Sequence, residues 1–131
     1  MGQIQGSSTA AGGRLDGSLQ GTAAAATDFA LGAGWGGTAT AALTAGSTDQ
    51  RGTLTITASA STPAQATATV THTFADGAFA SAPFPMVLVT STSAIDEGHV
   101  VSTATTTVGT WTFSVLPVAT KIYTFTYCYI A

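Results

Sequence analysis

The residues best suited to chemistry in this chain are the two carboxylates and the imidazole of the run Asp96-Glu97-Gly98-His99. Carboxylates and imidazoles are common metal ligands, but a metal site usually needs three or four ligands in fixed geometry. No second cluster of such residues accompanies this run. We therefore interpret Asp96, Glu97 and His99 as an exposed loop tip without a metal. Such a tip is a natural contact point in a recognition protein, because loops on a rigid scaffold carry binding surfaces.

A second set of residues imitates a hydrolase. His72 with Asp76 and one of the many serines could be arranged as a Ser-His-Asp triad, but a chain so rich in Ser and Thr produces such coincidences by composition alone. The chain has no Gly-x-Ser-x-Gly turn to expose a nucleophile. Cys128 has no basic neighbour to stabilise a thiolate, so we interpret it as a small buried apolar side chain. The sequence predicts no enzyme and no cofactor.

The low charge of the chain is its most unusual property. Charged residues make up 7% of its 131 residues, against roughly 25% in an ordinary soluble domain. The three basic residues cannot supply the many phosphate contacts that nucleic-acid binding needs. No run approaches the roughly 20 apolar residues of a membrane span, and the N-terminus resembles no secretory signal. We expect neither a nucleic-acid nor a membrane partner, and a chain assembled in a cytoplasm and covered by copies of itself or by a larger assembly.

Short runs rich in Thr and Val alternate between polar and apolar residues, as half-buried strands do. The expected strands cover residues 38–45, 52–59, 66–74, 84–91, 100–107, 110–116 and 121–130. Turns are expected at residues 47–52, where Asp49 and Arg51 would be solvated, at 75–77 and at 108–109. The pattern predicts an all-β fold: a single antiparallel β-sandwich, jelly-roll-like, of about seven to eight strands over residues 28–131.

The last expected strand is apolar on both faces. Tyr127 and Tyr129 share one face with two further aromatic residues, and Ile130 lies on the other. A strand of this kind belongs at the centre of a sandwich or at a subunit contact. We therefore predict a subunit interface at Tyr127, Tyr129 and Ile130.

Residues 1–27 differ in texture, because they are rich in Gly, Ser, Ala and Thr with a few isolated larger residues. Such a segment cannot build a core of its own. It is either a disordered tail or an extended arm that becomes ordered on a partner. In the second interpretation the contact residues are Ile4, Arg14, Leu15 and Leu19.

Several short motifs carry a family resemblance over roughly residues 29–131. They are Gly34-Trp35-Gly36, the turn 49–52, the strand 52–57, Val70-Thr-His-Thr-Phe74, Pro83 before Val87-Leu-Val89, and the closing run 122–131. Together they resemble a small β-sandwich domain of tailed-phage structural proteins, found in capsid decoration (cement) proteins and at tail-fibre tips. The second proline, Pro85, departs from that pattern. The resemblance implies a homotrimer and no catalytic residues.

The function expected from these observations is that of a capsid decoration protein on a virion. It would trimerise on the head and stabilise the shell, with the arm lying along subunits of the major capsid protein. The alternative is a receptor-binding tip of a tail fibre or minor tail protein, which would present loops such as 92–99 to a host glycan or protein.

Overall fold

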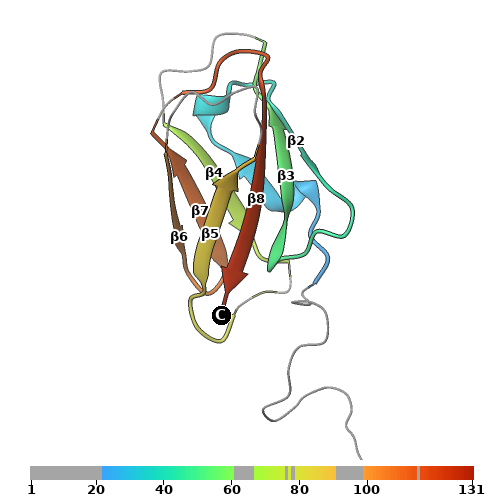
Figure 1. The fold of residues 1–131 in the computed structure, drawn as a ribbon, viewed down its shortest axis with the longest axis vertical. Helices are drawn as coiled ribbons and strands as arrows, with labels where there is room; N and C mark the ends of the chain where they lie inside the picture. The colour runs from blue at the N-terminus through green and yellow to red at the C-terminus, as the bar shows by residue number, and fades with distance from the viewer. Residues whose placement is uncertain (1–21, 61–66, 76, 78, 91–98, 115) are drawn as a thin grey trace, which may run out of the picture.

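The computed structural model describes residues 22–60, 67–75, 77, 79–90, 99–114 and 116–131, which form two packed antiparallel sheets (Figure 1). The strands are β1 (Phe29–Leu31), β2 (Thr40–Leu43), β3 (Arg51–Thr57), β4 (Ala68–Thr73), β5 (Phe84–Val89), β6 (Val100–Ala104), β7 (Val108–Phe113) and β8 (Ile122–Ile130). Two 3-10 helices, η1 (Ala26–Asp28) and η2 (Ala33–Trp35), flank β1. The sheets have the strand orders β1-β4-β7-β6 and β2-β3-β8-β5. The predicted all-β antiparallel sandwich is confirmed.

All seven expected strands are present, and the structure adds β1. The turn expected at residues 108–109 is wrong, because Val108 and Gly109 begin β7. The chain reverses just before them, where the Thr105 hydroxyl accepts hydrogen bonds from the backbone N–H groups of Thr107 and Val108 (3.3 and 3.2 Å). Threonine can therefore make the turn. Gly109 is needed in the strand instead, since the Tyr129 ring occupies the place of a Cβ there.

The core lies between the two sheets and is mostly aromatic. Strand β8 is central in its sheet, and every second side chain along it points inward. The buried apolar residues are Phe29, Trp35, Leu54, Ile56, Ala58, Ala68, Val70, Phe74, Trp111, Tyr123, Phe125, Tyr127 and Tyr129. Their burial supplies the main stabilising term, because the chain has one cysteine and so no internal disulfide.

Residues 22–24, just before η1, bond to the connection between β2 and β3. Ala23 forms an isolated antiparallel bridge with Thr48. The Ala24 N–H donates to the Ser47 carbonyl (3.1 Å), and the Thr22 carbonyl accepts from Asp49 N–H (2.9 Å). An arm that can leave the sandwich without breaking these contacts therefore has to end before Thr22.

Candidate interaction surface

Most of the residues predicted for contact lie outside the described part of the chain. These are the arm residues Ile4, Arg14, Leu15 and Leu19, and the loop residues Asp96 and Glu97. His99 is described and is exposed just before β6. Its N–H donates to the Ser114 hydroxyl (2.9 Å), which fixes its backbone beside the end of β7. The imidazole is thus available to a partner at this end of the sandwich.

The prediction of a subunit interface at Tyr127 and Tyr129 needs correction. Both side chains are buried in the chain's own core, because β8 turns its aromatic face toward the other sheet. Tyr129 accepts a hydrogen bond from Trp111 Nε1 (2.8 Å), and Tyr127 donates to the Thr48 carbonyl (2.7 Å). Burial raises the pKa of both phenols, so both hydroxyls stay protonated and can donate. Of the predicted interface residues, Ile130 alone faces outward, with 48% of its surface exposed.

The outward face of β5 and β8 is apolar. Phe84, Met86 and Leu88 on β5 are exposed by 78%, 50% and 59%. In the antiparallel register Phe84 lies opposite Ile130, and Met86 lies opposite Cys128. Residues opposite one another point to the same side of a sheet. We call these five residues, Phe84, Met86, Leu88, Cys128 and Ile130, the apolar face; Figure 1 shows its two strands side by side.

Most of the remaining outward positions of this sheet carry hydroxyl groups. Read from the register, these are Thr40, Thr53, Thr55, Thr57, Thr124 and Thr126, and Ala42 and the half-exposed Ile122 lie among them. Among the outward positions described on this sheet, Arg51 is the charged one, beside Cys128 on β3. The apolar face therefore passes into a mainly threonine rim with a single described charge, Arg51. This arrangement suits binding by burial and offers no group for acid–base chemistry.

The free edge of β5 is closed against further strands. The Pro85 carbonyl points away from β8, since it accepts a hydrogen bond from the Ser102 hydroxyl of β6 (3.4 Å). The nitrogen of the same residue points to that side and carries no hydrogen, so it cannot donate to an added strand. Proline on an edge strand is a common protection against edge-to-edge pairing. A partner would therefore meet this side of the molecule through the face of the sheet.

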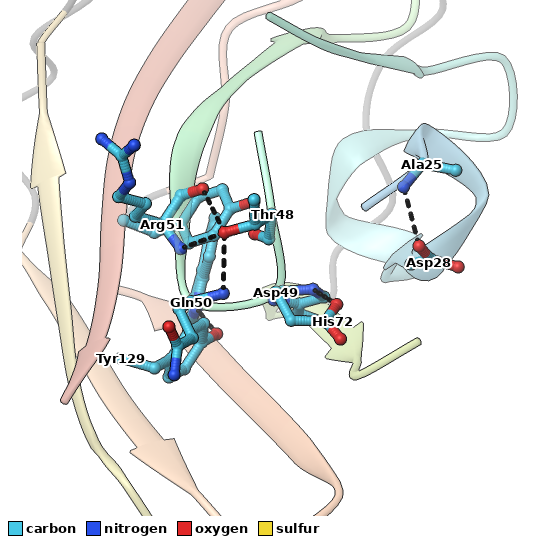
Figure 2. A network of polar contacts seen from close by, with 10 residues as sticks. Ala25, Asp28, Thr48, Asp49, Gln50, Arg51, His72 and Tyr129 are labelled. Atoms are coloured by element: carbon cyan, nitrogen blue, oxygen red, sulfur yellow. Dashed lines mark hydrogen bonds and ion pairs between the residues drawn. The ribbon is translucent and has the colours of Figure 1, made fainter. Parts of the chain in front are cut away.

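A buried polar pair lies on the inner side of the sandwich, where the sequence predicted a solvated turn. Asp49, in the connection from β2 to β3, is 3% exposed, and His72 of β4 is 0% exposed. The Asp49 carboxylate lies 3.5 Å from Nε2 of His72 (Figure 2). The alternation of β4 carried a signal for this burial, because His72 falls in phase with Val70 and Phe74. Asp49 carried none.

The environment of His72 favours a neutral ring. It stacks on Phe29 with centroids 4.0 Å apart, and Phe74, Tyr127 and Tyr129 surround it at 5.1 to 5.5 Å. Burial lowers the pKa of His72 from 6.5 to about 4, although the charge of Asp49 opposes this shift. The cost of removing a cation from water outweighs the attraction of Asp49 and the weaker attraction of Asp28.

The pair ties three segments together. Asp49 N–H holds Thr22, its carboxylate faces β4, and Phe29 of β1 stacks on His72. The connection itself is held by the Thr48 hydroxyl, which accepts from the N–H groups of Gln50 and Arg51 (both 3.3 Å). Because both side chains of the pair are buried, we assign the pair a structural role. In the part of the chain that the structure describes, no three His, Cys, Asp or Glu residues are grouped to hold a metal.

An open groove lies between the edges of β1 and β2. Its lining is uncharged and mostly of small residues: Ala26, Thr27, Phe29, Leu31, Gly32, Ala33, Gly36, Gly37, Ala39, Thr40 and Ala41. Such a lining supplies neither a nucleophile nor a charged group to orient a ligand. Among the described helices, none is long and apolar enough to cross a membrane.

Comparison with family models, with curated proteins and with solved structures finds no match to this chain. The resemblance to phage structural domains therefore stays a prediction. The apolar face is the surface of the described residues with the clearest capacity to bind.

Proposed function

We propose that this chain is a structural protein of a phage virion, a capsid decoration protein that trimerises on the head and stabilises the shell. The observation that carries the proposal is the apolar face with its mainly threonine rim. A contiguous exposed apolar patch is often an interaction site, and only 7% of the residues of this protein are charged. In a permanent assembly, neighbouring subunits cover such a surface.

The N-terminal segment supplies the second contact in this proposal. Ile4, Arg14, Leu15 and Leu19 lie along subunits of the major capsid protein. Burial of each apolar side chain contributes at most about 1.5–3 kcal/mol, and ordering of the glycine-rich backbone offsets much of this. Three arms on one trimer act together, so avidity raises the occupancy without strong individual contacts. The protein acts without catalysis or a cofactor, and without a nucleic-acid or membrane partner.

A receptor-binding tip of a tail fibre is the second candidate, and Phe84 favours it. This ring is 78% exposed at the start of β5, and sugars stack on exposed aromatic faces. The two tryptophans, which would suit a glycan site better, are both buried. A loop such as 92–99 would contribute contacts beside His99. The first candidate is preferred because Phe84 does not stand alone but belongs to the larger apolar face.

Gold-labelled antibody on intact particles in the electron microscope separates the two candidates. Decoration predicts label spread over the head. Label confined to the tail tip would overturn it and favour receptor binding.

A truncation tests the role of the arm. Deletion of residues 1–21 leaves the contacts of Thr22 and Ala24 in place, so the protein should fold and self-associate but fail to bind capsids. Leu15→Ser with Leu19→Ser is the matched variant at full length, and it should weaken capsid binding in the same direction. Unchanged capsid occupancy in both variants would refute the arm contact.

A further inference from the structure

We infer that the apolar face of β5 and β8 is covered by the same face of a second copy of this chain. The inference goes beyond the trimer of the proposed function, because a contact of like face with like face joins two copies about a two-fold axis. It names the surface and the arrangement, like face against like face, which the fold by itself leaves open.

The size of the apolar face fits the centre of a protein–protein interface. The exposed parts of its side chains sum to on the order of 400 Å², if a large side chain presents roughly 200 Å². A standard interface buries about 800 Å² on each partner, with an apolar centre inside a polar rim. The apolar face with its threonine rim has this composition. A contact confined to Phe84 would be too small for a stable complex.

The charge of the surface selects a copy as the partner. In a contact of like faces, the residues near the two-fold axis meet their own copies, so a charge at the centre of the face would be unfavourable. The apolar face carries no charge, and Arg51 lies one strand beyond it at the rim. A surface shaped for a charged partner would carry complementary groups at these outward positions. Their absence from the described positions of β5 and β8 removes the main obstacle to self-pairing.

The geometry of β5 directs the contact to the face. Pro85 has no N–H to donate at the edge. Its carbonyl already accepts a hydrogen bond from the Ser102 hydroxyl of β6. Continuous pairing of β5 with a β5 from another copy is therefore blocked. Stacking of the two apolar faces leaves this edge undisturbed and buries Phe84, Met86 and Leu88 together.

Cys128 is a built-in reporter of this arrangement. It is the one cysteine of the chain and lies opposite Met86 in the middle of the apolar face. Contrary to the burial expected from the sequence, it is partly exposed, and Arg51 lies opposite it on β3. Contact of like faces brings two Cys128 thiols within reach of a short bis-maleimide. Contact of the apolar face with a different surface of a copy keeps them apart.

The test combines the mass in solution with cross-linking of the purified full chain, in the absence of capsids. Wild-type protein should sediment as an oligomer and give a cross-linked pair on a denaturing gel. Leu88→Asp should weaken association at least tenfold and abolish the cross-link. Val101→Asp is the matched control, because Val101 is 53% exposed on β6 of the other sheet; it should behave as wild type. Circular dichroism confirms that both variants are folded.

Three results would overturn the inference. They are a monomeric wild type at the highest soluble concentration, equal association in Leu88→Asp and Val101→Asp, and an oligomer that gives no Cys128 cross-link. None of these depends on where the protein lies on a particle. Label at the tail tip with an intact cross-linked oligomer would refute decoration and leave the interface standing.

Discussion

The inside and the outside of the β2-β3-β8-β5 sheet invert the usual distribution of polarity. On the inner side, an aspartate and a histidine are buried among aromatic rings. On the outer side, Phe84, Met86 and Leu88 are exposed. Buried ionisable groups are unfavourable unless they are paired, and a contiguous exposed apolar row is often an interaction site. The inner pair therefore stabilises the fold, whereas the outer row is the surface that we propose to be covered by another molecule.

The inner region is most sensitive at His72. His72→Ala should lower the free energy of unfolding by about 3–5 kcal/mol, because it opens a cavity between four rings and leaves the Asp49 carboxylate without its facing imidazole. Urea denaturation followed by tryptophan fluorescence measures this loss. His72→Phe separates the two causes, since it keeps a ring but removes the polar partner. A loss below about 1 kcal/mol for His72→Ala would contradict the structural role of the pair.

A matched pair of leucines compares the two regions directly. Leu54 is fully buried on β3, and Leu88 is 59% exposed on β5. Leu54→Ala should cost about 2–5 kcal/mol of folding stability, whereas Leu88→Ala should change it by less than about 0.5 kcal/mol in dilute protein. Denaturation should be measured at a concentration where wild type is dissociated. Equal losses would mean that Leu88 is packed inside the protomer.

The pH dependence of stability sharpens the account of the inner pair. Because the pKa of His72 is lower in the folded chain than its ordinary 6.5, the unfolded chain takes up a proton first as the pH falls. The contribution of neutral His72 is therefore fully present above pH 6.5 and is lost between 6.5 and about 4. The loss amounts to about 3 kcal/mol at most.

Urea denaturation across this pH window checks the expectation. Asp49 and Asp28 are the charged groups that act on His72, and both favour its protonation. His72→Phe should lack this part of the pH dependence. The same slope in wild type and variant would show that other groups cause it.

A smaller effect is expected at Tyr129. Tyr129→Phe keeps the ring but leaves the Nε1–H of Trp111 buried without its acceptor at 2.8 Å. An unsatisfied buried donor costs about 1–3 kcal/mol. Thermal unfolding should detect this loss. The packing of the ring against Gly109 should be kept, because the phenylalanine ring stays in place. No change in the transition temperature would indicate that water replaces the hydroxyl.

The fold was predictable because the period of two is strong in almost every strand. Val70, His72 and Phe74 share one phase, and the four aromatic residues of β8 share another. Strand β1 was missed because its three residues are too few to display a period. Asp49 was misjudged because turn residues carry no periodicity, so nothing in the sequence announces that a turn folds inward.

The sequence also could not show which face of β8 points into the core. Both of its faces carry large apolar side chains, so alternation cannot say which face meets the other sheet and which points outward. The structure decides this through position, because β8 lies between β3 and β5 and its aromatic face is opposed by Trp111 and Phe29. Ile130 therefore remains a predicted interface residue, and Tyr127 and Tyr129 become core residues.

The central claim, that a second copy covers the apolar face, is tested most directly by the rate at which Cys128 reacts with a maleimide at increasing protein concentration. The claim predicts that the rate falls as the protein associates, and that Leu88→Asp reacts at the fast rate throughout. A rate that is independent of concentration, and equal in wild type and Leu88→Asp, would contradict it.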